Sequence, residues 1–357
     1  MKDEAGVQIC RDECRECAMK EERMKKIELT NSMQDVMELP QLSDFKRFLI
    51  YSPLSEESPA PEQEKMNRSP LSSLAEIGWS PEGIVNGLNF LTEALETRRV
   101  SRYFIYPEEE TSDDPRKKDV NLVRILPETP DPSRPFIILC AGGAYMSVCT
   151  MVEALPAARH MAEAGYTVFL MTYRVGIQKA AFHALDDLAA AVRYLGIHGE
   201  ALGIDPARYA IGGFSAGANL VSNWGSAFIG YKHYGLPKPI CMFPIYTYID
   251  IKAESQRDEN GGLIAPMLGE NWRDLLNRFH LPDQINGDYP PCYLVCGKDD
   301  QVVPCSSSEL MKEKLDAAGV PAILEEADHA PHGFGDGTGT EVEGWPERAL
   351  KFMESLL

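Results

Sequence analysis

The stretch that decides the fold is Tyr209-Ala-Ile-Gly-Gly-Phe-Ser-Ala-Gly-Ala218. It begins with strand-like apolar residues, and the chain from Ala218 to Phe228 has a helical pattern. Between them, Gly213, Ser215 and Gly217 form the pattern G-x-S-x-G. Small flanking residues let a serine stand on a tight, strained strand-to-helix turn that lifts its hydroxyl above a sheet. The N-terminus of the helix also favours a developing negative charge, so Ser215 is the predicted nucleophile.

Outward from this turn, strand-like and helical segments alternate from residue 101 onward. Runs such as Phe136–Cys140 are continuously apolar, which is typical of strands buried on both faces of a parallel sheet. The segments Ala184–His198 and Trp345–Leu357 carry apolar residues at helical spacing. The pattern predicts an α/β fold with a mostly parallel eight-stranded sheet flanked by helices. The predicted strands are Tyr103–Tyr106, Asn121–Leu126, Pro135–Cys140, Thr167–Tyr173, Tyr209–Gly212, Ile240–Phe243, Tyr293–Cys296 and Ala322–Glu325.

Residues 1–100 have a different character, helical but broken by a polar Pro/Ser/Glu stretch from about Ser52 to Pro70. We therefore predict a helical N-terminal extension, 1–100, in front of an α/β catalytic domain, 101–357. A long connection at 245–291 is an insertion of the kind that forms a lid or a pocket wall, and it contains one amphipathic piece, Met267–Phe279. The helices expected in the extension are Glu4–Leu29, Leu42–Leu49 and Pro81–Glu96.

A serine hydroxyl needs a general base, and the base needs a carboxylate to orient it. His332 lies in a glycine-containing loop after the last predicted strand, and this position favours it over His329. Asp300 follows the strand Tyr293–Cys296, at the sheet edge where Ser215 is expected. We favour it over its neighbour Asp299, which would then cap a turn or a helix. The predicted catalytic residues are Ser215, His332 and Asp300.

The loop Cys140-Ala-Gly-Gly-Ala-Tyr145 follows the apolar strand that ends at Cys140. Small residues there let backbone N–H groups approach a substrate oxygen closely. The predicted oxyanion-hole donors are the amides of Gly143, Ala144 and Ala216. Tyr145 and Phe214, the neighbours of these groups in the chain, are the predicted substrate contacts.

The order Ser215, Asp300, His332, with a glycine-rich loop upstream, resembles the α/β-hydrolase superfamily over residues 101–357. Within it, the chain resembles the esterase/lipase group related to hormone-sensitive lipase and to acetyl-xylan-esterase-like hydrolases. Those enzymes carry His-Gly-Gly-Gly or Pro-Gly-Gly-Gly-Tyr where this chain has Ala141-Gly-Gly-Ala-Tyr145. The resemblance implies an α/β-hydrolase fold and a serine carboxylesterase that acts through an acyl-enzyme on a small or medium acyl ester, acetylated carbohydrates included. Extensions such as 1–100 cap the active site in this superfamily or make subunit contacts in a homo-oligomer.

Two other functions stay open, a serine peptidase or amidase of the same fold and a non-catalytic ligand-binding member. The sequence Ala216-Gly-Ala218 favours an esterase over a peptidase, whose turn tends to carry Tyr before the second glycine. Non-catalytic members tend to lose a triad residue, and all three candidates are present here.

The composition argues against several classes of partner. The 357 residues include 35 Lys+Arg and 54 Asp+Glu, a formal net charge of −19. This balance argues against nucleic acid and favours a neutral or cationic ester over an anionic one. No apolar run reaches the about 18 residues of a membrane span. The charged start Met1-Lys-Asp-Glu4 is followed by no apolar signal core, so we expect a cytoplasmic protein.

The nine cysteines do not suggest a disulfide scaffold. Small core residues of a reducing compartment are expected at Cys140, Cys241, Cys292 and Cys296. The triplet Cys10, Cys14 and Cys17 has the spacing of the iron–sulfur ligands in radical S-adenosylmethionine enzymes. In a charged helical run, however, this spacing puts all three on one helix face, which favours a simple apolar stripe. We expect neither a metal nor an organic cofactor.

Overall fold

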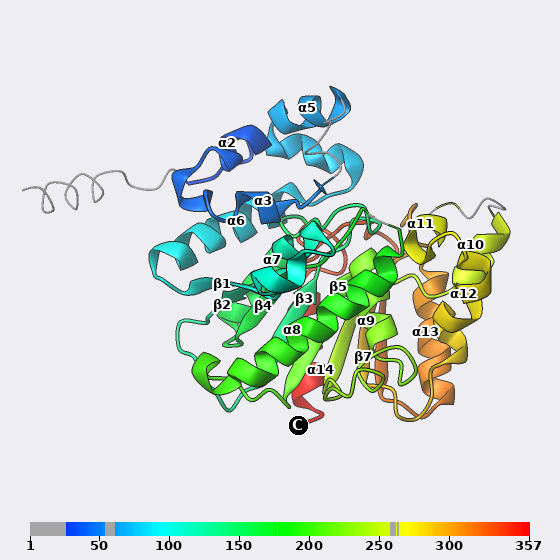
Figure 1. Ribbon diagram of the computed structural model, residues 1–357. Coiled ribbons are helices and arrows are strands. Elements are labelled where there is room, and N and C mark those ends of the chain that lie inside the picture. Colours follow the sequence, from blue (N-terminus) through cyan, green and yellow to red (C-terminus); the bar gives the residue numbers. More distant parts are fainter. Residues whose placement is uncertain (1–25, 54–60, 177, 258–261, 263) are drawn as a thin grey trace, which may run out of the picture.

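The computed structural model describes residues 26–53, 61–176, 178–257, 262 and 264–357 (Figure 1). Eight strands form one sheet in the order β1-β2-β4-β3-β5-β6-β7-β8. β2 runs antiparallel to β1 and to β4, and all other neighbours are parallel. The predicted mostly parallel eight-stranded sheet is therefore confirmed. The strands are β1 (Val100–Phe104), β2 (Asn121–Ile125), β3 (Phe136–Cys140), β4 (Val168–Thr172), β5 (Tyr209–Phe214), β6 (Cys241–Ile245), β7 (Cys292–Gly297) and β8 (Ala322–Ala327).

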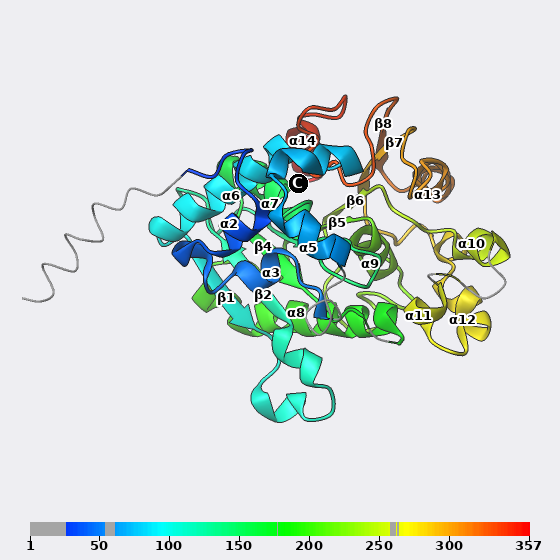
Figure 2. The ribbon, with the colours of Figure 1, turned by 90° about the horizontal axis from the view of Figure 1, so that it is seen from above.

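Helices cover both faces of this sheet (Figure 2). One face carries α7 (Ala154–Glu163) and α14 (Trp345–Glu354). The other carries α8 (Ala180–Leu202), α9 (Ala216–Trp224) and α13 (Ser306–Ala317). Because both faces are covered, every residue of β3 to β7 is buried, and these strands read as continuous apolar runs rather than as alternating ones.

Two predicted boundaries in the α/β part were wrong. The first strand is Val100–Phe104 instead of Tyr103–Tyr106, because it pairs with β2 in the register Val100↔Ile125. The expected amphipathic piece Met267–Phe279 is divided at Gly269, whose φ of 91° ends one helix. The connection between β6 and β7 thus holds three α-helices in its described residues, α10 (Ile251–Arg257), α11 (Ile264–Leu268) and α12 (Trp272–Phe279).

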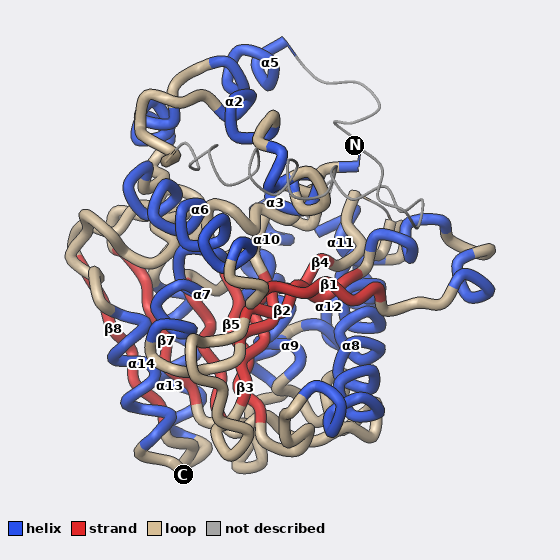
Figure 3. The backbone as a smooth tube through the Cα atoms, turned by 90° about the vertical axis from the view of Figure 1, so that its left-hand side faces the viewer, coloured by secondary structure: helices blue, strands red, loops and turns tan. Residues whose placement is uncertain are grey.

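The N-terminal segment lies over one edge of the sheet (Figures 1 and 3). Its helix α6 has the predicted bounds, Pro81–Glu96, and Ser80 caps it by accepting the Gly83 N–H. The polar stretch before Pro70 contains α5 instead of being a continuous break, and the expected helix Leu42–Leu49 shrinks to α3 after a 3₁₀ turn. Most of the expected helix Glu4–Leu29 lies outside the described residues, and its described end is not helical. The elements are α2 (Met33–Met37), η1 (Pro40–Leu42), α3 (Lys46–Leu49), α5 (Pro61–Arg68), η2 (Leu71–Ile77) and α6.

No helix among the described residues combines the length and the apolar character that a membrane crossing requires.

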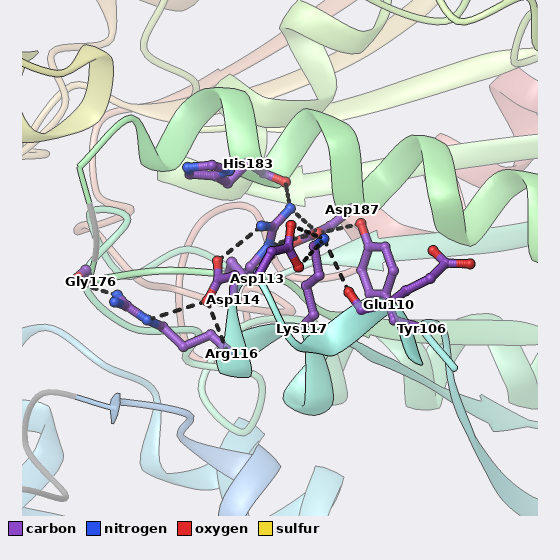
Figure 4. A network of polar contacts seen from close by, with 10 residues as sticks. Tyr106, Glu110, Asp113, Asp114, Arg116, Lys117, Gly176, His183 and Asp187 are labelled. Carbon is purple, nitrogen blue, oxygen red and sulfur yellow. Dashed lines mark hydrogen bonds and ion pairs between the residues drawn. The ribbon is translucent and has the colours of Figure 1, made fainter. Parts of the chain in front are cut away.

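A buried ionic network fixes the carboxyl end of β4 to α8 (Figure 4). The Arg174 guanidinium lies 2.7 Å from the Asp187 carboxylate of α8 and 3.0 Å from that of Asp114. The hydroxyl of Tyr106 donates to the same Asp187 oxygen at 2.7 Å. Asp187 is fully buried. Burial raises the pKa of this carboxyl, against the opposing effect of Arg174. Through these bonds the network joins the chain around Tyr106 and Asp114, the end of β4 and helix α8.

We predict that Asp187→Ala lowers the free energy of unfolding by about 3 kcal/mol, because it deprives a buried guanidinium of a partner. Chemical denaturation monitored by tryptophan fluorescence measures this. The control is Asp186→Ala at the neighbouring exposed position, where only a hydrogen bond from Tyr234 is lost and a change below about 1 kcal/mol is expected. Equal losses in the two variants would contradict the prediction.

Candidate active site

Ser215 stands at the junction between β5 and α9, with a backbone φ of 51° and ψ of −118°. A residue with a side chain rarely adopts this conformation, and it persists only where the surroundings enforce it. One enforcing contact is the hydrogen bond from the Ser215 N–H to the carbonyl of Ile245 on β6, 3.1 Å long. The predicted strand–turn–helix around Ser215 is present.

The two glycines of the motif let neighbouring backbone segments approach each other more closely than a side chain would allow. A Cβ on Gly213 would lie 2.2 Å from the carbonyl oxygen of Gly217. A Cβ on Gly217 would lie 2.1 Å from the carbonyl oxygen of Cys140 at the end of β3. Real Cβ atoms do not approach so closely, so any side chain at either position would push the turn away from the sheet.

The structure brings Ser215, His332 and Asp300 together in one hydrogen-bonded chain. The Oγ of Ser215 lies 2.9 Å from Nε2 of His332, and Nδ1 of His332 lies 2.7 Å from Oδ2 of Asp300. The second oxygen of Asp300, Oδ1, accepts the N–H groups of Val302 and Val303, both at 2.8 Å. The Asp300 side chain is 1% exposed, so this carboxylate is held from both sides and shielded from water.

The two alternative residues lie outside this chain. Asp299 accepts the N–H of Ala330 at 2.8 Å and so fastens the histidine loop to the end of β7. His329 has a side chain that is 79% exposed, and its Nδ1 lies 3.5 Å from Asp299. Neighbouring carboxylates thus point in different directions, and only Asp300 reaches His332.

The loop after β3 presents free amides beside Ser215. Gly143 and Ala144 have φ values of 129° and 53°, which turn the chain sharply here. Within the described part of the chain, the N–H groups of Gly143, Ala144 and Ala216 have no hydrogen-bond acceptor. Gly143 and Ala144 line the same cavity as Ser215, and Ala216 begins α9 directly after it. Unpartnered amides beside a nucleophile can accept an oxyanion.

The side chains of Tyr145 and Phe214, the predicted substrate contacts, do not line this cavity. Tyr145 is 5% exposed, and its hydroxyl donates to Oδ1 of Asn219 at 2.9 Å. It contributes to a separate, neighbouring cavity of about 210 Å³. Phe214 is fully buried against the rings of Tyr246 and Trp345.

The cavity above Ser215 has a volume of about 760 Å³ and two kinds of wall. One wall comes from the α/β part and includes Ser215 and His332. The other comes from the N-terminal segment and combines apolar residues with the polar residues Gln34, Ser52, Glu64, Asn67 and Arg68. The apolar residues of this second wall are Met33, Met37, Ile50, Met66 and Trp79.

Glu153 is a site residue that the sequence analysis missed. It lines the cavity, yet it is only 4% exposed. The available signal was a single carboxylate in the apolar run Met151-Val-Glu-Ala-Leu155. A buried carboxylate requires partners, and neither the residue before it nor the one after it can supply them.

The expectation for Cys296 was wrong. Instead of a free core thiol, it forms a disulfide with Cys305, and the loop that carries Asp300 lies between the two. Cys296 therefore no longer counts as a free thiol in favour of a reducing compartment. Together with Glu326, the two sulfurs form the one group of metal-ligand type found in the described residues, and bonded sulfurs offer no thiolate to a metal. The triplet Cys10, Cys14 and Cys17 lies outside the described residues.

Known proteins resemble this chain in sequence and in fold. Endo-1,4-beta-xylanase B of Butyrivibrio fibrisolvens is 25% identical over 228 residues, which are 60% of this chain and 35% of that protein. This chain thus spans about a third of that relative's length. An acetyl ester-xyloside bifunctional hydrolase from Caldicellulosiruptor lactoaceticus is 27% identical, with a TM-score of 0.61 over 72% of this chain and 96% of that one. A thermophilic esterase from Thermogutta terrifontis, 20% identical, shares the fold with a TM-score of 0.59 over 73% and 96% of the two chains.

The model of the alpha/beta hydrolase fold family matches residues 137–336. This range includes β3 with its glycine-rich loop, the turn at Ser215, and both Asp300 and His332. The chain belongs to the α/β-hydrolase-fold family.

Proposed function

We propose that this chain is a serine carboxylesterase that hydrolyses small or medium acyl esters. The observation that carries the proposal is the hydrogen-bonded chain of Ser215, His332 and Asp300 next to three amides that lack an acceptor in the described residues. Membership of the α/β-hydrolase-fold family and the likeness to an acetyl ester hydrolase support an ester as the substrate.

In the proposed reaction, Nε2 of His332 takes the proton of Ser215 as Oγ attacks the ester carbonyl carbon. Asp300 keeps the Nδ1–H tautomer and stabilises the imidazolium that forms. The tetrahedral oxyanion accepts hydrogen bonds from the amides of Gly143, Ala144 and Ala216. His332 then protonates the leaving alcohol, which leaves an acyl group on Ser215. Water repeats the cycle with His332 as base and releases the acid.

We further propose that the N-terminal segment is a fixed cap that selects the substrate. Its residue Tyr51 pairs with Val148 through two backbone hydrogen bonds of 3.0 and 2.8 Å, just after the glycine-rich loop. The N–H of Met151 donates to the carbonyl of Leu49 at 2.8 Å. A cap held by backbone bonds keeps its cavity wall in place before the substrate arrives. The name of the Caldicellulosiruptor lactoaceticus neighbour makes acetylated sugars the first esters to test.

Replacing the nucleophile tests the central claim. Ser215→Ala should lower hydrolysis of p-nitrophenyl acetate by at least about 10³-fold and abolish labelling by a fluorophosphonate probe, because no other group can form the acyl-enzyme. Undiminished labelling of the variant would show a different nucleophile. A folded wild type that does not label would contradict the proposal, and faster cleavage of aminoacyl p-nitroanilides than of esters would indicate a peptidase.

The neighbouring aspartates offer a matched pair of variants. Asp300→Asn should lower kcat roughly 10⁴-fold, because the amide N–H₂ donates to Nδ1 and leaves the proton of His332 on Nε2, the wrong tautomer. Asp299→Asn should change kcat less than about threefold, because its remaining carbonyl still accepts the Ala330 N–H. Steady-state kinetics at pH 7 compare the two. Similar losses in both variants would remove Asp300 from its proposed role.

The cap proposal predicts which acyl-chain lengths the substrate can have. Met37→Trp puts a larger side chain into the cavity wall, so the ratio of kcat/KM for decanoyl to acetyl esters should fall roughly tenfold. Ile77→Trp is the control, since Ile77 is 54% exposed in the same segment and lies outside the cavity wall. An unchanged ratio for Met37→Trp, or an equal fall for both variants, would show that the cap does not select the acyl chain.

A further inference from the structure

A second buried carboxylate, that of Glu153, lies directly behind the nucleophile and takes no part in the proposed proton transfers. Its Oε2 accepts the N–H of Gly142 at 2.5 Å. Gly142 itself is pressed against the serine turn, because a Cβ on it would lie 2.6 Å from Cβ of Ser215. The carboxylate thus holds the first glycine of the loop, and the next two amides are the proposed oxyanion donors.

The other oxygen of Glu153 leads to the histidine loop. Oε1 accepts the hydroxyl of Tyr246 at 3.0 Å. The ring of Tyr246 packs against the imidazole of His332, with centroids 4.8 Å apart. Hydrogen bonds therefore join Gly142, Glu153 and Tyr246, and the ring of Tyr246 carries the contact on to His332.

Tyr246 is held in this position under strain. It follows β6 with a φ of 40°, a left-handed conformation that is unfavourable for an aromatic residue. The bond from its N–H to the carbonyl of Val295 on β7, 2.8 Å long, fixes the backbone there. Ala144, Tyr145 and Ser215 also have positive φ. Strained residues gathered at one place are typical of a site whose geometry is fixed before the substrate binds.

We propose that Glu153 and Tyr246 are positioning residues that hold the oxyanion loop, 141–145, and the histidine loop, 330–336, in one fixed relation on the two sides of Ser215. This inference rests on the proposed esterase function. With the Gly142 amide directed back to Glu153, the loop turns the amides of Gly143 and Ala144 toward the cavity. With the Tyr246 ring against His332, the imidazole keeps its line between Ser215 and Asp300. Both effects act on the transition state more than on the bound substrate.

Tyr246→Phe tests the inference most directly, since it keeps the ring against His332 and removes only the hydroxyl. We expect kcat for a short acyl ester to fall about tenfold while KM stays within twofold. The fraction of molecules titrated at Ser215 by a fluorophosphonate should stay that of the wild type, which separates misplaced loops from unfolded protein. An unchanged kcat, or a fall in kcat that follows the titrated fraction, would overturn the proposal.

A double-mutant cycle tests whether the two residues act as one bridge. In Glu153→Leu, neither the Gly142 N–H nor the Tyr246 hydroxyl keeps its acceptor at this position. If both side chains serve the same bridge, kcat of the double variant should be at most about twofold lower than kcat of the less active single variant. Losses that multiply would show independent roles and overturn the bridge.

The control is Tyr166→Phe, which removes another tyrosine-to-glutamate hydrogen bond, the 2.6 Å bond to Glu354, at the opposite edge of the sheet. Its kcat should equal that of the wild type. A tenfold loss in this control would mean that any such bond affects kcat and would overturn the assignment. If the wild type neither hydrolyses esters nor labels at Ser215, the proposed function fails, whereas an active wild type with an unaffected Tyr246→Phe removes only the bridge.

Discussion

The left-handed backbone of Ser215 is the constraint around which the rest of the site is arranged. A turn this tight can form only if the strand before it and the helix after it are both anchored. β5 provides the first anchor, because it lies between β3 and β6 in the middle of the sheet. α9 provides the second, because the close approach of Gly217 to the carbonyl of Cys140 lets its first turn sit on the end of β3. The strain at one residue is therefore balanced by packing of two strands and a helix.

The same parallel arrangement explains how distant residues meet at Ser215. The carboxyl ends of β3, β5, β6 and β7 lie at one edge of the sheet, and each is followed by a loop that contributes to the site. β3 leads to the oxyanion loop, β6 to Tyr246 and β7 to Asp300, while the loop after the edge strand β8 returns with His332. In such a sheet the site groups come together because the loops after these parallel strands all start at the same edge.

The sequence predicted the structure best where burial produces a continuous run of apolar residues. The strands β3 to β7 could be predicted because both faces are covered, and Ser215 because the turn demands small neighbours. The choice between Asp299 and Asp300 depended on side-chain direction, which spacing alone does not determine. Glu153 could not be placed, because its partner Tyr246 lies 93 residues away in the chain. The helix α5 escaped prediction because its composition is that of a linker, and a helix of eight residues depends on tertiary contacts rather than on propensity.

The pairing of Tyr51 with Val148 bears on how the N-terminal segment is related to the rest of the molecule. Residue 100 marks a change of sequence character, yet the backbone just after the glycine-rich loop forms hydrogen bonds with a residue from the other side of that boundary. The hydroxyl of Tyr51, a fully buried residue, also reaches Asp119, and Arg102 packs over Phe45 and Phe48. Cutting the chain at residue 100 would remove part of the core itself and expose unpaired amides near Ser215. The segment is therefore not a transferable module, and its exchange between relatives would have to include the loop with which it pairs.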